Sequence, residues 1–254
     1  MKADKRIVVI IPARWASTRF PGKPLANIAG KPMIQRVYER VSQARDIDEV
    51  LVATDDERIA GAVAAFGGRA VLTPSDLPSG TDRTAFVARQ LHADIFINVQ
   101  GDEPLIDPRA VELTATLLLE DETADLATLA RRVKSAEDLE NPNKVRVVLD
   151  RFGHALYFSR AVIPYLRDEK DASRRLERFP YLEHIGIYGY RREALFKLTT
   201  LPPSSLEEAE RLEQLRALEN GMTIKVGICD FATWGVDTPQ DAVEVEKMIR
   251  ERSL

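Results

Sequence analysis

The sequence contains only one cysteine, Cys229, and this scarcity limits the chemistry that it can support. A single thiol cannot form an intrachain disulfide or a cluster of thiolate metal ligands. No stretch approaches the roughly 20 apolar residues that a membrane-spanning helix needs. Residues 1–6 are short and charged, without the apolar stretch and cleavage site of a signal peptide. These absences predict a soluble, cytoplasmic protein that makes no membrane contact.

An excess of basic residues is also missing. Against 40 Asp and Glu stand 36 Lys and Arg, which gives a formal charge of -4. Binding to nucleic acid or to an anionic membrane generally requires a net basic surface, so neither partner is expected. The sequence has 3 histidines without metal-site spacing. Because it also lacks a Gly-x-Ser-x-Gly elbow and any Cys/His nucleophile arrangement, acyl-enzyme chemistry is not expected.

In the first half of the chain, short β-branched runs alternate with helical patterns. This alternation predicts βαβ units and a Rossmann-like, mostly parallel α/β sheet. Strands are expected at residues 7–11, 49–54, 70–72 and 95–99, and helices at 33–43, 58–66 and 84–91. The intervening loops 12–24, 73–83 and 100–104 should meet at the carboxyl edge of the sheet, where ligands bind in such folds.

The second half predicts a smaller mixed α/β lobe. A hairpin is expected at residues 144–149 and 155–158, a mobile loop or solvated helix at 167–179, and a strand at 185–190. A single helix is expected at 206–220, a strand at 223–228 and a last helix at 239–249. We therefore predict one domain over residues 1–254, with a core at about 1–140, a lobe at about 141–235 and a returning helical segment at 236–254.

The first loop, PARWASTRFPGKP at residues 12–24, carries Arg14, Arg19 and Lys23 directly after a buried strand. Backbone N–H groups and fixed cations in such a loop can neutralise a triphosphate. It is not a Walker loop, since Pro24 follows the lysine where Ser or Thr would be required. On charge alone, a solvated basic connector explains it equally well.

Two aspartates at strand ends are candidate ligands for Mg²⁺. Asp102 lies in NVQGDEP at residues 98–104, and Asp237 lies in WGVDTP at residues 234–239. Magnesium takes one or two carboxylates together with phosphate oxygens. The alternative for Asp237 is to cap the following helix, although Thr238 can do this instead.

The third loop contains LPSGTDR at residues 77–83. Its exposed backbone groups can read the edge of a base, and Asp82 and Arg83 can pair to brace the turn. By itself this segment is an ordinary surface turn.

Taken together, the first-loop motif resembles the nucleotide-binding signature of sugar nucleotidyltransferases, and its RWASTRFPGKPL form is similar to that of the CMP-Kdo synthetases. The resemblance covers about residues 7–245 and is weakest at 167–179. It implies a magnesium site at Asp102 and Asp237. It also implies that these two aspartates act in catalysis together with Arg14, Arg19 and Lys23. It also implies nucleotide contacts from Pro12, Ala13, Arg14, Arg19, Lys23, Ser79, Gly80, Arg83, Gln100 and Asp102.

Four later segments also resemble the family: 155–160, 184–190, 212–216 and 234–239. An acidic octulosonate needs a cation for its carboxylate and polar groups for its hydroxyls. The implied sugar-binding residues are Arg19, Gln100, Arg160, His184, Tyr188, Glu213 and Gln214. Without the resemblance, His184 and Tyr188 could share a core-facing strand face, and Glu213 and Gln214 could be solvated helix positions.

The implied activity is transfer of CMP from CTP to 3-deoxy-D-manno-octulosonate (Kdo), with release of pyrophosphate, which activates Kdo for lipopolysaccharide biosynthesis. No general base is assigned. Close alternatives are cytidylyltransferases for 8-amino-Kdo or a sialic acid, and an alternative of another class is a non-catalytic nucleotide sensor. A homodimer is expected, and Leu212, Leu215 and Leu218 form either its seam or part of the core.

Overall fold

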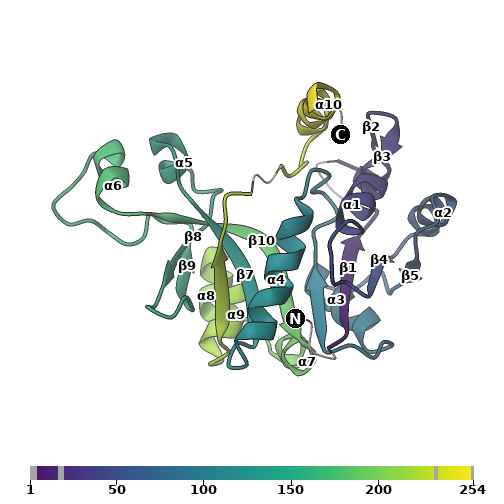
Figure 1. Ribbon diagram of the computed structural model, residues 1–254, viewed down its shortest axis with the longest axis horizontal. Coiled ribbons are helices and arrows are strands. Elements are labelled where there is room, and N and C mark those ends of the chain that lie inside the picture. Colours follow the sequence, from purple (N-terminus) through teal and green to yellow (C-terminus); the bar gives the residue numbers. More distant parts are fainter. Residues whose placement is uncertain (1–4, 17–19, 232–233, 253–254) are drawn as a thin grey trace.

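The chain folds around one twisted sheet with helices on both faces (Figure 1). The computed structural model describes residues 5–16, 20–231 and 234–252. In the first half the elements are β1 (Ile7–Ala13), η1 (Lys23–Leu25), β2 (Asn27–Ile28), β3 (Lys31–Pro32), α1 (Met33–Val41), β4 (Glu49–Thr54), α2 (Glu57–Ala65), β5 (Ala70–Leu72), α3 (Gly80–Ala88), β6 (Ile95–Asn98), α4 (Pro108–Glu120) and β7 (Leu126–Arg132). They continue as α5 (Ala136–Glu140), β8 (Arg146–Leu149), β9 (Ala155–Ser159), α6 (Ala172–Arg178), β10 (Leu182–Arg191), α7 (Arg192–Thr200), α8 (Ser205–Glu210), α9 (Gln214–Glu219), β11 (Ile224–Ile228) and α10 (Pro239–Arg252).

The strand order of the main sheet is β11-β7-β10-β6-β1-β4-β5. The pairs β1–β4, β1–β6, β4–β5 and β7–β11 are parallel, as predicted for a mostly parallel sheet. Strand β10 runs antiparallel to both of its neighbours, β6 and β7. A strand from the second half of the chain thus lies in the middle of the sheet, and one sheet joins the predicted core and lobe. The boundary near residue 140 stays a prediction.

Alternate side chains of β1 point to two separate cores, which explains its unbroken apolar sequence. Val8 and Ile10 pack in one core with residues of α3, α7 and α9. Ile7, Val9 and Ile11 pack in the other with residues of α1, α2 and α4. Both faces of the strand are covered, and the carboxyl end of β1 is therefore held firmly in place.

The predicted loop at residues 73–83 is shorter than expected, because α3 already begins at Gly80. Ser79 is its N-cap, and its side chain accepts a hydrogen bond from the backbone N–H of Asp82 at 3.1 Å. A serine followed three residues later by an acidic residue is a helix-start pattern, which overrides the turn character of the Gly-Thr-Asp sequence.

The predicted single helix at residues 206–220 is wrong. Arg211 adopts a left-handed conformation with φ 56° and separates α8 from α9. The break lets Glu207 on α8 pair with Arg216 on α9, and it buries Leu212 and Leu215. Leu212, Leu215 and Leu218 all belong to the core of this subunit, where Leu218 is partly buried. These contacts favour the core alternative for the three leucines, and the homodimer stays a prediction.

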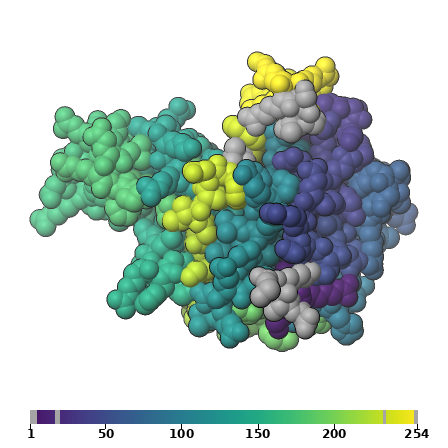
Figure 2. Space-filling view, viewed as in Figure 1, coloured from purple at the N-terminus to yellow at the C-terminus, as the bar shows by residue number. Residues whose placement is uncertain are grey.

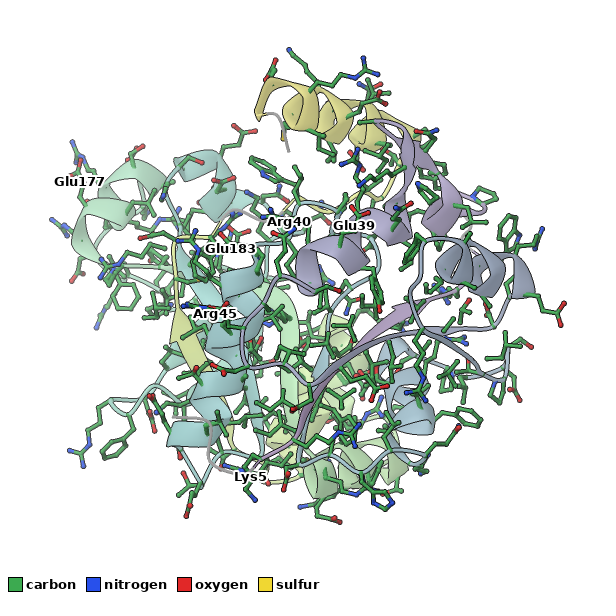
Figure 3. All side chains as sticks on the ribbon, turned by 45° about the vertical axis from the view of Figure 1, so that its right-hand side comes forward. Lys5, Glu39, Arg40, Arg45, Glu177 and Glu183 are labelled. Carbon is green, nitrogen blue, oxygen red and sulfur yellow. The ribbon has the colours of Figure 1, made fainter. Side chains whose placement is uncertain are left out.

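The second half also forms a projecting lobe. Strands β8 and β9 make the predicted antiparallel hairpin, and α6 lies within the predicted segment 167–179. Figure 2 shows this green region extending away from the body of the molecule. In Figure 3, Glu177 on α6 lies at its outer tip, whereas Glu183 on β10 lies nearer the centre. None of the helices in the described ranges combines the length and apolarity that crossing a membrane requires.

Candidate active site

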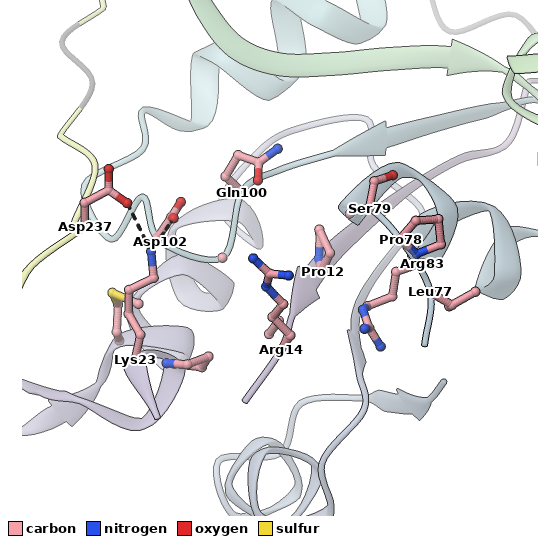
Figure 4. A pocket seen from close by; sticks show the side chains of 15 residues that line it. Pro12, Arg14, Lys23, Leu77, Pro78, Ser79, Arg83, Gln100, Asp102 and Asp237 are labelled. Carbon is pink, nitrogen blue, oxygen red and sulfur yellow. Dashed lines mark hydrogen bonds and ion pairs between the residues drawn. The ribbon is translucent and has the colours of Figure 1, made fainter. Parts of the chain in front are cut away.

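A cavity of about 330 Å³ opens at the carboxyl ends of β1 and β6 (Figure 4). Its wall is formed by four stretches of the chain that are distant in sequence. The lining residues are Pro12, Ala13, Arg14, Lys23, Pro24, Met33, Leu77, Pro78, Ser79, Gly80, Arg83, Gln100, Gly101, Asp102 and Asp237. The structure therefore gathers nearly all of the residues predicted to bind nucleotide around one space, while Arg19 lies outside the described residues.

Two glycines allow the walls of this cavity to approach each other. A Cβ atom on Gly101 would lie 2.7 Å from the carbonyl oxygen of Pro12, which is too close for any L side chain. A Cβ on Gly80 would lie 3.3 Å from Cγ of Pro12. Gly101 thus packs against the backbone at the end of β1, and Gly80 at the start of α3 packs against the Pro12 ring, which places peptide groups at the cavity wall.

The first loop is anchored by Trp15. Its backbone N–H donates to Oδ1 of Asp55 at 3.1 Å, and its carbonyl accepts from the N–H of Gly22 at 3.3 Å. The guanidinium carbon of Arg58 lies 3.4 Å from the centre of the Trp15 ring. The ring also lies against Gly22, whose φ of +68° favours glycine. These contacts fix both ends of the loop segment that carries Arg14 and Lys23.

Lys23 lies between the two predicted metal ligands (Figure 4). Its Nζ is 2.6 Å from Oδ2 of Asp102 and 3.5 Å from Oδ1 of Asp237, and it also donates to the carbonyl of Val236 at 2.9 Å. The N–H of Val236 donates to the carbonyl of Asp102 at 2.9 Å, which ties the returning segment to the end of β6. The two carboxylates therefore face the same small volume.

Thr238 makes the capping contact that was considered as the alternative for Asp237, whose ligand role stays a prediction. Oγ1 of Thr238 accepts from the N–H of Asp241 at 3.3 Å, so Thr238 caps the start of α10. The carboxylate of Asp237 is instead directed towards Lys23, and its side chain is 52% exposed. This arrangement leaves Asp237 accessible to a ligand in the cavity.

On the opposite wall, the predicted pairing of Asp82 with Arg83 is wrong. Asp82 accepts from the Ser79 hydroxyl at 2.7 Å, while Arg83 donates to Oδ2 of Asp55 at 3.2 Å and also to Thr73. The reason is the helical start at Gly80, which turns adjacent residues to different sides. Because the Ser79 hydroxyl is held in the cap, what Ser79 and Gly80 offer to a base is mainly their backbone.

Four predicted sugar-binding residues lie outside the cavity lining, His184 and Tyr188 on β10 and Glu213 and Gln214 at the start of α9. The rings of His184 and Tyr188 have centroids 5.4 Å apart. Burial, with contributions from Tyr190 and Glu213, raises the pKa of Tyr188. Gln214 is 5% exposed, and its Nε2 has no hydrogen-bond partner among the described residues. Of the predicted sugar-binding residues that the structure describes, only Gln100 also lines the cavity.

Arg160 braces the turn between α8 and α9. Its Nε donates to the Glu210 carbonyl at 2.8 Å, and its Nη1 donates to the Pro142 carbonyl at 3.2 Å. Its backbone N–H donates to the Glu210 carboxylate at 2.9 Å. A role as the cation for a sugar carboxylate stays a prediction.

Two acids next to residues that line the cavity were not assigned a function from the sequence. Asp55 joins the first loop to α3 through Trp15 and Arg83. Burial and the neighbouring Asp102 charge raise the pKa of Glu103 to about 7, although Arg131 opposes the shift. The signal for both was their position at the end of a buried strand, but acids there often only favour a helix N-terminus.

Comparison with known proteins agrees with this geometry. The chain matches a family model described as cytidylyltransferase over residues 8–224. It is 51% identical over 251 residues to a 3-deoxy-manno-octulosonate cytidylyltransferase of Geotalea daltonii, covering 97% of this chain and 99% of that protein. A protein of the same name from Geobacter sulfurreducens is 50% identical over 248 residues, covering 96% and 99%.

Solved structures agree with the sequence comparison. A CMP:2-keto-3-deoxy-manno-octonic acid synthetase complexed with CTP superimposes with a TM-score of 0.91 at 46% identity, covering 97% of this chain and 99% of that one. A cytidylyltransferase from Leptospira borgpetersenii has a TM-score of 0.60 at 15% identity, covers 98% of this chain and 95% of that one, and shares the fold. The chain therefore belongs to the cytidylyltransferase family, and within it to the 3-deoxy-manno-octulosonate cytidylyltransferases.

Proposed function

We propose that this protein transfers CMP from CTP to Kdo, forming CMP-Kdo and pyrophosphate. The observation that carries the proposal is the placement of Lys23, Asp102 and Asp237 at one end of a cavity whose other end is formed by Ser79 and Gly80. A nucleoside triphosphate has a neutral base at one end and a polyanion at the other. The cavity offers backbone groups to the first and charged groups to the second.

In the proposed reaction, the anomeric hydroxyl oxygen of Kdo attacks the α-phosphorus of CTP in line. A new bond forms between this oxygen and phosphorus, the bond from phosphorus to the β-phosphate oxygen breaks, and the hydroxyl proton is released to solvent. Such transfers depend on positioning and charge neutralisation more than on covalent participation by the protein. Arg14 and Lys23 are placed in the cavity to neutralise the triphosphate and the departing pyrophosphate.

We also propose that Asp102 and Asp237 hold Mg²⁺ when CTP is bound. Both carboxylates already reach one cationic atom, Nζ of Lys23, so their separation suits a shared ion. The described residues contain no cluster of three or more His, Cys, Asp or Glu side chains suited to a metal. Two carboxylates fit magnesium, which takes its other ligands from phosphates and water. Bound there, the ion would neutralise the α-phosphate and lower the pKa of a coordinated hydroxyl.

For Kdo, the proposed contacts are Gln100 and the group around His184, Tyr188, Glu213 and Gln214, with Arg160 and Arg19 completing the set. The unpartnered Nε2 of Gln214 supports this assignment, because a buried amide nitrogen without a partner is costly unless a ligand satisfies it. We further propose that the protein works as a cytoplasmic homodimer. Sedimentation of the purified protein over a range of concentrations tests the dimer.

A pyrophosphate-release assay tests the function directly. The assay combines each of the four nucleoside triphosphates with Kdo, 8-amino-Kdo or a sialic acid, with Mg²⁺ and with a chelator. Release with CTP and Kdo that requires Mg²⁺ supports the proposal. Faster pyrophosphate release with another sugar would reassign the substrate. If the protein binds CTP but releases no pyrophosphate with any of the sugars, a nucleotide sensor is favoured.

A further inference from the structure

A bulge in β10 brings His184 and Tyr188 together. Opposite them on β7, His184 pairs with Ala130 and Tyr188 pairs with Thr128, and the register shifts between Ile185 and Tyr188. Four steps along β10 therefore correspond to only two along β7. In a regular strand, residues four apart are roughly 13 Å from each other. Here the two side chains meet, with ring centroids 5.4 Å apart.

Thr128 holds this bulge from the neighbouring strand. It is fully buried, and its Oγ1 lies 2.7 Å from the Ile187 carbonyl oxygen and 3.2 Å from the Ile185 carbonyl oxygen. The same Oγ1 lies 2.8 Å from Nε2 of His184. Both carbonyls can only accept hydrogen bonds, whereas the threonine hydroxyl has a single hydrogen to donate.

This proton count determines the state of the imidazole. The hydroxyl hydrogen goes to a carbonyl, with Ile187 the nearer, so Oγ1 must accept from Nε2 of His184. If Nε2 were unprotonated, it would compete with the carbonyls for that one hydrogen, and lone pairs would face each other in a buried site. Burial also lowers the pKa of His184 to about 3, so the ring is neutral. Nδ1 is left as the only acceptor on the ring.

The surroundings of the ring leave this acceptor for a ligand. His184 packs edge-on against Phe158, with centroids 5.1 Å apart, and tilted against Tyr188. These neighbours fix the plane of the ring, and no group in the described part of the chain hydrogen-bonds to Nδ1. A neutral acceptor cannot bind a carboxylate, but it can accept a hydrogen bond from a hydroxyl.

We propose that Thr128 is a positioning residue that holds His184 as the Nε2–H tautomer, so that Nδ1 accepts a hydrogen bond from a hydroxyl of the sugar acid. The inference rests on the proposed function, because it assigns His184 to the sugar. It goes further by giving His184 a hydroxyl and not the carboxylate, and by giving a role to a buried threonine that touches neither substrate.

Imidazole nitrogen NMR of protein labelled at its 3 histidines tests the tautomer, with His184 assigned from the spectrum of His184→Gln. Kinetics of Thr128→Val, Thr128→Ser and Thr114→Val test the consequence. Thr114→Val is the matched control, because Thr114 is also fully buried and its hydroxyl donates to the Ala110 carbonyl at 2.8 Å, with no histidine involved.

We expect the free wild-type protein to show His184 protonated at Nε2, and Kdo binding to shift the signal of Nδ1. Thr128→Val should lose the single tautomer and raise the KM for Kdo about tenfold, with the KM for CTP unchanged within about twofold. Thr128→Ser should restore most of the wild-type KM, and Thr114→Val should leave both constants near wild type.

Protonation of His184 at Nδ1 in the wild type overturns the inference, as does a Thr128→Val variant with an unaltered tautomer or unaltered KM for Kdo. If Thr128→Val does not fold, the wild-type spectra decide, since an Nδ1 signal that Kdo leaves unchanged rejects the hydroxyl contact. Failure of the proposed function has a different signature, namely a wild-type protein that releases no pyrophosphate from CTP and Kdo. In that case the ligand-free spectrum still decides whether Thr128 sets the tautomer.

Discussion

Nζ of Lys23 lies 2.6 Å from Oδ2 of Asp102 and within ion-pair distance of Asp237, so one ammonium group bridges two carboxylates that are far apart in the sequence. Without a substrate, the lysine compensates the repulsion between the two acids. Under the proposed function, a triphosphate entering the cavity would compete for the lysine, and the two acids would then be available to the proposed magnesium ion. The same three side chains thus suit both the empty and the loaded site.

Replacing either acid should stop catalysis without unfolding the protein. We expect Asp102→Asn and Asp237→Asn each to lower kcat at least about 100-fold, because the proposed magnesium loses one of its two protein ligands. Asp237 is half-exposed and Lys23 keeps its other partner, so stability should change by less than about 1 kcal/mol. Pyrophosphate release and urea denaturation measure the two effects.

Asp168→Asn, the same change at an exposed site, is the control. Full turnover by either variant would remove the metal assignment.

Gly101→Ala should impair the nucleotide cavity. Its Cβ would meet the Pro12 carbonyl at 2.7 Å, so the ends of β1 and β6 must separate. We expect a loss of about 1–3 kcal/mol in stability and a higher KM for CTP. Gly61→Ala is the matched control, because Gly61 lies within α2 and a Cβ there meets nothing within 4 Å. That change should stabilise the protein by up to about 1 kcal/mol. Equal effects of the two alanines would show that the close approach is unimportant.

The nucleotide wall could be predicted from sequence because each of its parts follows a recognisable strand. The β-branched runs predict the bounds of β1, β4, β5 and β6 to within one residue, with one exception. The exception is the carboxyl end of β1, which runs two residues further than predicted. Parallel strands then bring their carboxyl ends to one edge. The pairing of Arg83 with Asp55 could not be predicted, because it depends on where α3 begins and on which way each side chain turns.

The surroundings of the predicted sugar-binding residues were less accessible to sequence reasoning. Nothing local places β10 between β6 and β7, and nothing local predicts the bulge that joins His184 to Tyr188. The role of Thr128 follows only once three hydrogen-bond partners are seen around one oxygen. Likewise, the break at Arg211 is imposed by burial of Leu212 and by the Glu207–Arg216 pair, which a helical propensity pattern does not contain.

Removing Arg83 should destabilise the protein strongly. The side chains of Arg83 and Asp55 are only 4% and 10% exposed, so Arg83→Met leaves a buried carboxylate without its partner. Breaking such a pair costs about 3–5 kcal/mol, and the double variant with Asp55→Asn should recover part of the loss. Urea denaturation measures both. Arg45→Met is the control, since Arg45 is 82% exposed in its pair with Glu112 and should cost less than about 1 kcal/mol. If Arg83→Met cost no more than Arg45→Met, the brace would have no energetic significance.

His184 should make the fold sensitive to acid. Burial lowers its pKa from 6.5 to about 3 in the folded protein, whereas the unfolded chain keeps an ordinary histidine. As the pH falls below about 6.5, the unfolded state binds a proton that the folded state cannot, so stability is lost progressively until the pH approaches 3. His184→Gln removes this contribution, so its free energy of unfolding, measured in urea, should fall between pH 7.5 and 4.5 by about 3 kcal/mol less than that of the wild type. His92→Gln, at an exposed histidine, should keep the wild-type dependence of stability on pH.

If the wild type and His184→Gln lose stability in parallel as the pH falls, His184 takes up a proton as readily in the folded protein as in the unfolded one. The neutral acceptor proposed for the sugar would then not exist at low pH.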